Sequence, residues 1–167
     1  ITMDNSILDK MEVLFGPSSV LYGSDALGGV ISFHTKKPAF SDNTGKVDIG
    51  GNAFARYSTA TNERTIHADL TISGKKIASL TSFTISDFGD LLQGSRYYSD
   101  FPDWGKRFFY VKQIGGVDSM VVNGNVNKQV QSGYQQYELL QKIVMKTGKM
   151  EHSLNFQYST SSDVNRY

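Results

Sequence analysis

The stretch of residues 11–38, MEVLFGPSSVLYGSDALGGVISFHTKKP, constrains the fold of this chain more than any other. Its apolar start, residues 11–14, is too short for a helix. Pro17 suits the first turn of a helix, where its missing N–H would be unpaired in any case. The glycine pair at 28–29 permits a tight backbone approach, and the β-branched and aromatic residues 30–35 predict a strand. We therefore expect a strand, a helical turn, a glycine corner and a second strand.

This stretch carries no arrangement that catalysis requires. It has no paired carboxylates, no nucleophile beside a base, and no glycine-rich loop that leads to a Lys-Ser or Lys-Thr pair. The glycine pair is not a GxGxxG element, so a nucleotide site is not indicated. Because we find no nucleophile and base converging on one face elsewhere, we expect a protein that is not an enzyme and has no catalytic residues.

The same stretch resembles the C-terminal end of the plug domain of TonB-dependent outer-membrane receptors. The family pattern is close to E-V-L-R-G-P-x-S-x-L-Y-G-x-x-A-x-G-G-V-I-N-I-x-T-K-x-P, and the match is long and ungapped. The matching positions are Glu12, Val13, Leu14, Gly16, Pro17, Ser19, Leu21, Tyr22, Gly23, Ala26, Gly28, Gly29, Val30, Ile31, Thr35, Lys36 and Pro38. Phe15 and Ser32 depart from the pattern, where the family usually has Arg and Asn. The missing Arg removes one ion pair that the plug could make with the barrel.

The resemblance implies a domain boundary at residue 38. Residues 1–38 would be the C-terminal part of a plug, and residues 39–167 the N-terminal part of a β-barrel domain. The structural positions of the plug motif would be Gly16, Pro17, Tyr22, Gly23, Gly28 and Gly29. In that family the plug fills a barrel of roughly 22 strands that begins just after this motif. Lys36-Lys37 suits either the neutralisation of an acidic cargo or the closure of the last plug strand.

The composition favours strands joined by turns. The chain has 19 Phe and Tyr residues together (10 and 9), 16 Gly and only 3 Pro. It has no cysteine, which excludes disulfides and thiolate metal sites, and its net charge of +1 gives no electrostatic case for nucleic acid. No apolar run approaches the roughly 18 residues of a membrane helix. Ile1-Thr2-Met3 does not resemble a native start, so we expect a fragment or a processed piece.

After residue 44 the hydrophobic pattern takes a period of two, which is typical of strands. Residues 47–57, 65–72 and 152–159 alternate apolar and polar side chains, and residues 134–145 do so with Gln141 as an exception. Residues 77–88 have a poorer phase, because Leu80 falls on the side opposite Phe83 and Ile85. A bulge or burial on both faces would explain this strand.

Every second connection between the predicted strands is short. Short turns are predicted at Gly74 and Gly148, and a long irregular region covers residues 89–131, with a hairpin around Gly115-Gly116. If the first strand runs outward, both short turns are periplasmic and the long region is extracellular, as in transmembrane barrels. Tyr57 and Tyr158 would then lie near the outer strand ends, where aromatic girdles occur.

One apolar face per strand suits a barrel wall in a membrane, and it also suits a soluble sandwich. Two features favour the barrel: the alternation of short turns with longer connections, and the many Asn, Gln, Thr, Ser and Asp residues on the polar faces. About five long strands cannot close a plugged barrel. The expected fold class is therefore all-β: a fragment of a plugged 22-stranded transmembrane β-barrel, with the plug end followed by about five antiparallel strands.

Two further stretches, residues 86–91 with Gly94 and residues 157–164 with Arg166-Tyr167, resemble outer loops of receptors for haem, haemoglobin and iron chelates. The resemblance implies a Gram-negative outer-membrane receptor for active, TonB-coupled uptake of an iron chelate, either haem or a ferric siderophore. Its partners would be that ligand, outer-membrane lipid and a TonB-type energy-transducing protein that binds outside this chain; no cofactor is expected. The alternatives are a receptor for cobalamin or another large ligand, and a soluble β-module for adhesion or polysaccharide binding.

The candidate ligand-binding residues are aromatic and lie in the predicted outer loop: Tyr97, Tyr98, Trp104 and Phe108. They would stack on a haem or a catecholate, or else pack the loop onto itself. A haem iron needs an axial ligand such as His or Tyr, and Tyr97 and Tyr98 are the candidates. The three histidines are not spaced as a metal cluster, so no metal site is expected. Asp87 and Asp90 flank a glycine, which suits a cation site or an Asx-type turn.

Overall fold

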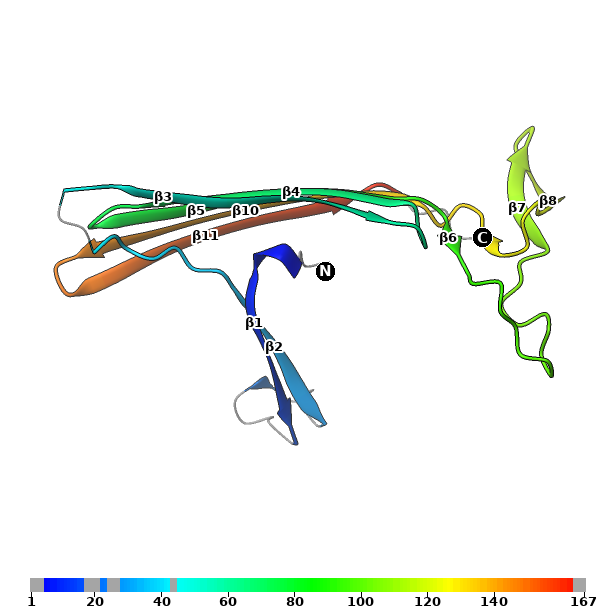
Figure 1. The fold of residues 1–167 in the computed structure, drawn as a ribbon, viewed down its shortest axis with the longest axis horizontal. Helices are drawn as coiled ribbons and strands as arrows, with labels where there is room; N and C mark the ends of the chain where they lie inside the picture. The colour runs from blue at the N-terminus through cyan, green and yellow to red at the C-terminus, as the bar shows by residue number, and fades with distance from the viewer. Residues whose placement is uncertain (1–4, 17–21, 24–27, 43–44, 164–167) are drawn as a thin grey trace. The chain divides into compact units, whose positions relative to one another are not determined.

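The computed structural model describes residues 5–16, 22–23, 28–42 and 45–163. In these residues one 3-10 turn precedes eleven strands, which confirms the all-β class (Figure 1). The elements are η1 (Asn5–Ile7), β1 (Leu8–Phe15), β2 (Gly29–Thr35), β3 (Asp48–Ser58), β4 (Glu63–Ser73), β5 (Ile77–Phe88), β6 (Leu91–Leu92), β7 (Phe109–Ile114), β8 (Val117–Val122), β9 (Lys128–Gln129), β10 (Tyr134–Thr147) and β11 (Met150–Ser161). Within the described ranges, no helix has the length and apolar character needed to cross a membrane.

The first two strands form an antiparallel hairpin, whose register runs from Leu8 opposite Thr35 to Phe15 opposite Gly29. The predicted strand at residues 30–35 is confirmed as β2. Strand β1 is longer than the apolar run at residues 11–14, because strand pairing uses backbone groups that every non-proline residue carries. Gly29 is needed at the corner, since a Cβ there would lie 2.7 Å from the carbonyl oxygen of Leu14.

The five long strands form one sheet in the order β11-β10-β5-β4-β3. The five strands predicted from the period-two pattern are confirmed, and so are the short turns at Gly74 and Gly148 that join β4 to β5 and β10 to β11. Strands β5 and β10 are neighbours in the sheet although residues 89–133 separate them along the chain. The sheet is open, with β3 and β11 at its edges, as a fragment of a barrel wall would be.

The two faces of β4 are inverted relative to a strand of a soluble protein. Thr65 and His67 are each 2% exposed, whereas Ile66 between them is 64% exposed. Thr65 Oγ1 donates a hydrogen bond of 3.0 Å to Ser86 Oγ, and His67 Nδ1 lies 2.7 Å from Thr84 Oγ1. The polar face is therefore packed and hydrogen-bonded to β5, and the apolar face is left open.

Strand β5 alternates regularly, and its irregular hydrophobic phase has a specific cause. Ala78, Leu80, Ser82, Thr84 and Ser86 are all buried on its polar side. Leu80 is apolar there because it packs in a small core with Ile7 of η1 and Leu140 of β10. The phase reflects a contact with the N-terminal segment rather than a local bulge.

Gln141, the exception in β10, lies among polar neighbours. Its Oε1 accepts a hydrogen bond of 2.6 Å from Thr81 Oγ1, and its Nε2 donates one of 2.8 Å to Ser79 Oγ. Both partners belong to the adjacent strand β5. A cross-strand group of three side chains therefore satisfies the amide on the otherwise apolar face.

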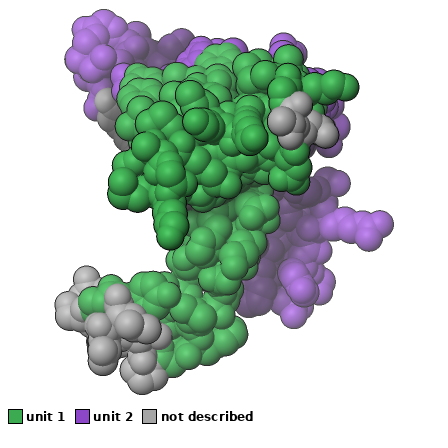
Figure 2. All heavy atoms as spheres, turned by 90° about the vertical axis from the view of Figure 1, so that its left-hand side faces the viewer, with its two compact units in different colours: residues 1–52, 68–83, 138–158 green, residues 53–67, 84–137, 159–167 purple. Residues whose placement is uncertain are grey.

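The chain divides into two compact units (Figure 2). Each of the five long strands contributes residues to both. Unit 1 holds residues 1–52, 68–83 and 138–158, with the β1–β2 hairpin and the turns at Gly74 and Gly148. Unit 2 holds residues 53–67, 84–137 and 159–167, with the long loop. In that loop the predicted hairpin is confirmed as β7–β8 around Gly115-Gly116, and a further short pair, β6–β9, was not predicted.

Candidate functional site

The long loop between β5 and β10 is closed at its base by Asp90. Asp90 Oδ1 accepts hydrogen bonds from the backbone N–H groups of Ser132 at 2.9 Å and Gly133 at 3.1 Å. Its Oδ2 pairs with Lys128 Nζ at 3.0 Å. The two ends of the loop are therefore held together by one carboxylate. Neither the cation site nor the Asx-type turn considered for Asp90 describes this arrangement.

Burial of Asp90 by itself raises the pKa of its carboxyl. The hydrogen bond and charge of Lys128, together with the amides of Gly133 and Ser132, outweigh that effect and lower the pKa below its ordinary value of 3.8. A carboxyl whose pKa is lowered in the folded state stabilises that state above its unfolded pKa. The stabilisation is lost as the pH falls through the lowered pKa.

We expect Asp90→Ala to lower the free energy needed to open the base of the loop by about 1–3 kcal/mol, because two amides and a lysine lose their acceptor. Asp90→Asn is the matched control, since its Oδ1 still accepts from both amides and only the charge is lost. Hydrogen exchange at the Ser132 and Gly133 amides measures the effect. The protection factors of both amides, which correct for the intrinsic exchange rate at each pH, should also fall below pH 4 in the parent protein. Equal protection factors in all three proteins would contradict this role.

A group of asparagines organises the middle of the loop. Asn123 is 6% exposed, and its Nδ2 donates to the carbonyl oxygens of Arg107 and Lys128, each at 2.8 Å. Asn127 Oδ1 accepts hydrogen bonds from the Tyr97 hydroxyl and from Gln93 Nε2. These residues were missed in the sequence, although the run Asn123-Gly-Asn-Val-Asn127 is a signal of side-chain-to-backbone bonding.

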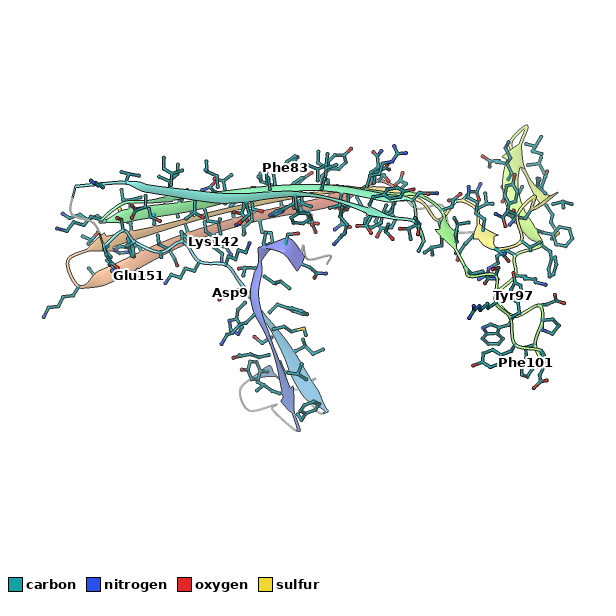
Figure 3. The ribbon with its side chains drawn as sticks, viewed as in Figure 1. Asp9, Phe83, Tyr97, Phe101, Lys142 and Glu151 are labelled. Atoms are coloured by element: carbon teal, nitrogen blue, oxygen red, sulfur yellow. The ribbon has the colours of Figure 1, made fainter. Side chains whose placement is uncertain are left out.

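Three of the four predicted ligand-binding side chains lie together in this loop. Tyr97, Tyr98 and Trp104 line a shallow hollow of about 230 Å³. Figure 3 labels Tyr97 on this loop. The other lining residues are Gln93, Gly94 and Arg96. Phe108 does not line this hollow; its carbonyl oxygen accepts a hydrogen bond of 2.8 Å from the Asn123 amide.

The two tyrosines have different surroundings. The hydroxyl of Tyr97 donates to Asn127, and Lys106 Nζ lies 4.6 Å from the centre of its ring. Tyr98 is 81% exposed and Trp104 is 78% exposed. Tyr97 is therefore held by the loop itself. In the part of the chain that the structure describes, no such side-chain contact holds Tyr98 or Trp104, which also line the hollow.

A second hollow of about 310 Å³ adjoins the first, because Gln93 lines both. It is lined by Leu91, Leu92, Gln93, Gly105, Arg107, Asn127 and Gln129. No carboxylate among the described residues pairs with Arg96 or Arg107. Exposed aromatic rings beside two guanidinium groups suit a flat ligand that carries negative charge.

The β1–β2 hairpin carries a histidine beside a serine and a glutamate, and this group does not form a catalytic relay. Ser32 Oγ lies 3.3 Å and Glu12 Oε2 3.0 Å from the same atom, His34 Nε2. In a relay the hydroxyl and the carboxylate contact different ring nitrogens. In the described ranges, no three metal-ligating side chains gather as a metal site would require.

The predicted plug positions are only partly visible. Gly16 and Gly23 have φ angles of +94° and +98°, in the region that favours glycine, and the Gly16 amide donates a bond of 3.3 Å to the Gly28 carbonyl. Tyr22 is 52% exposed, and Gly29 makes the close approach to Leu14. Pro17 lies outside the described residues, as does the helical turn expected there.

Two known receptors have sequences similar to parts of this chain. The chain is 28% identical over 95 residues to the hemin receptor of Yersinia enterocolitica, a match that covers 57% of this chain and 14% of that protein. It is 41% identical over 49 residues to the ferrioxamine B receptor of Salmonella typhimurium, which covers 29% of this chain and 7% of that protein. No family model and no solved structure matches the chain. The chain is thus similar, over short stretches, to parts of much longer receptors.

Proposed function

We propose that the chain is part of a Gram-negative outer-membrane receptor for active, TonB-coupled uptake of an iron chelate. Residues 1–38 form the end of the plug in this proposal, and residues 39–167 form the first part of the barrel wall. The observation that carries the proposal is the inverted burial of strand β4, in which Thr65 and His67 are buried and hydrogen-bonded while Ile66 is exposed. A barrel wall has this pattern, because its apolar side faces lipid and its polar side faces the lumen.

The names of the similar proteins support an iron-containing ligand. One is a hemin receptor and the other a ferrioxamine B receptor, and their cargoes share a ferric ion held in an organic chelate. We therefore place haem and ferric siderophores ahead of cobalamin. A TonB-type protein supplies the energy and contacts the receptor outside this chain.

The aromatic loop is the proposed ligand-binding surface. Trp104 and Tyr98 supply exposed rings for stacking, and Arg96 supplies a cationic group in the same hollow. A haem presents a flat ring and two carboxylates, and both features have complements here. Tyr98 Oη is the proposed axial ligand, because the Tyr97 hydroxyl already donates to Asn127.

The alternative of a soluble β-module for adhesion or polysaccharide binding fits the sheet less well. Such a sandwich would bury the apolar face of each strand, whereas Ile66, Leu70 and Ile72 are 64%, 46% and 41% exposed. The two hypotheses predict different requirements for detergent. The soluble module would fold in water without detergent, and the receptor would not.

A haem titration of the full-length receptor in detergent, followed by visible absorbance, tests the proposal. We expect a saturable shift of the Soret band, with a ferric hydroxamate such as ferrioxamine B titrated in parallel by intrinsic fluorescence. Binding of either ligand supports an iron-chelate receptor and identifies its class. A folded receptor that binds neither ligand would contradict the iron-chelate assignment.

A further inference from the structure

We propose that residues 35–41 form a fixed strap that keeps the root of the β1–β2 hairpin on the sheet while the rest of the plug is remodelled. The inference rests on the proposed function, since it concerns what moves during uptake. Five of these seven residues contact the sheet or its flanking turns, all of them within unit 1. We call this segment the strap.

The strap begins with contacts to three strands. Lys142 Nζ of β10 donates to the Thr35 carbonyl oxygen at 3.2 Å and also to the Thr35 hydroxyl. Lys36 Nζ lies 3.2 Å from Asp69 Oδ2 of β4, and Lys37 pairs with Glu151 of β11. Figure 3 labels Lys142 and Glu151, the partners on β10 and β11. Three consecutive residues are therefore attached to β10, β4 and β11.

Asp69 is the most enclosed partner of the strap. Its side chain is 4% exposed, and besides Lys36 its Oδ1 accepts hydrogen bonds from the backbone N–H of Asn52 at 3.1 Å and from Asn52 Nδ2 at 3.3 Å. A carboxylate so enclosed strongly disfavours the loss of its cation. The Lys36 pair is thus the contact that resists removal of the strap most.

The strap ends with a second group of contacts. Lys146 Nζ of β10 lies 4.2 Å from the centre of the Phe40 ring. The Ser41 amide donates a bond of 3.0 Å to the Gly74 carbonyl, and its hydroxyl donates to Asp48 at the start of β3. Pro38 and Ser41 are buried, so the strap is packed as well as paired.

The dimensions fit a crossing of the sheet. Seven extended residues span about 23 Å at roughly 3.3 Å each. Strands β11 and β4 are three strand spacings apart, about 14 Å at roughly 4.8 Å each. The adjacent residues Lys37 and Lys36 reach both strands through their long side chains. The hairpin root is also held by Ile7, whose carbonyl accepts from the Lys36 amide at 2.8 Å and whose side chain packs on Leu80 and Leu140. We infer that remodelling during uptake leaves residues 35–41 in place.

A cross-link across one strap contact tests this inference in the full-length receptor in cells. Lys37→Cys and Glu151→Cys are combined and bridged by a bis-maleimide that reaches as far as the two native side chains. The bridged receptor should import its iron chelate at a rate within about twofold of that of the same variant before bridging. The reason is that the bridge joins two positions that already stay in contact during uptake in this proposal. If import fell to background after bridging while ligand binding stayed unchanged, the proposal that residues 35–41 stay in place would be contradicted.

Hydrogen exchange provides the second measurement, on the parent receptor without any substitution. The Ser41 and Lys36 amides should stay protected when the ligand and the periplasmic domain of the TonB-type partner are added together. A tenfold or greater acceleration at both amides would also overturn the strap. Failure of the proposed function has a different signature, namely a parent receptor that neither binds nor imports the chelate.

Discussion

Leu70→Arg is expected to destabilise the folded receptor in a bilayer by about 2–4 kcal/mol, because it places a charge on the side of β4 that faces lipid in the proposed barrel. Leu70 is 46% exposed and belongs to the apolar side of the strand. Thr71→Arg is the matched control. Thr71 is the next residue, on the opposite side, and it lines a polar hollow of about 340 Å³ with Asp69 and Asn52.

The measurement is a urea titration of the full-length receptor in lipid vesicles, followed by the heat-sensitive gel mobility of the folded barrel. Leu70→Arg should lower the transition midpoint strongly, and Thr71→Arg should leave it nearly unchanged. If both substitutions were tolerated, or if Thr71→Arg were the more damaging, the apolar side of the sheet would not face lipid.

The combined substitution Tyr98→Ala with Trp104→Ala is expected to weaken haem binding by about tenfold or more. Each exposed ring contributes roughly 0.5–1.5 kcal/mol by stacking, and 1.4 kcal/mol corresponds to a factor of ten. Phe101→Ala is the control, because Phe101 is a 65% exposed aromatic residue of the same loop that does not line the hollow. Absorbance titration in detergent gives the affinities.

Tyr98→Phe separates stacking from ligation. The variant keeps the ring and loses Oη, so it should retain most of the affinity gained by stacking but change the Soret maximum of the bound haem. An unchanged spectrum would rule out Tyr98 as the axial ligand. An effect of Phe101→Ala as large as that of the double substitution would show that the hollow is not the binding surface.

The strands and turns could be predicted because their signals are local. The period-two pattern in residues 65–72 depends only on neighbouring side chains, and β4 contains that segment. The same holds for the hairpin at Gly115-Gly116, whose φ angles of +60° and +85° require residues that tolerate the left-handed region. Local chemistry was therefore sufficient for the five long strands and for the β7–β8 hairpin.

The contacts that explain the exceptions are not local. Leu80 breaks the pattern of β5 because Ile7, far away in the sequence, covers it. Gln141 occupies an apolar face because Ser79 and Thr81 of the next strand satisfy its amide. A sequence shows such residues as exceptions to the pattern. It does not show which partner offsets the free-energy cost of placing them on a face of opposite polarity.

The candidate site was predictable to a similar extent. The aromatic residues of the loop were identifiable by type, and Tyr97, Tyr98 and Trp104 do lie together. Their different roles depend on Asn127, which holds the Tyr97 hydroxyl, and on Asp90, which closes the loop through residues 132 and 133. These hydrogen bonds join residues thirty or more positions apart in the sequence, so residue type alone could not reveal them.

Uptake by intact cells tests the central proposal most directly. Iron-starved Gram-negative cells that lack their own haem and siderophore receptors would carry the full-length receptor, with and without a functional TonB-type protein. We predict that haem or a ferric hydroxamate restores growth and delivers labelled iron only when both proteins are present. Restoration without the energy-transducing protein, or no uptake of any iron chelate by a receptor that is folded in the outer membrane, would contradict the proposal.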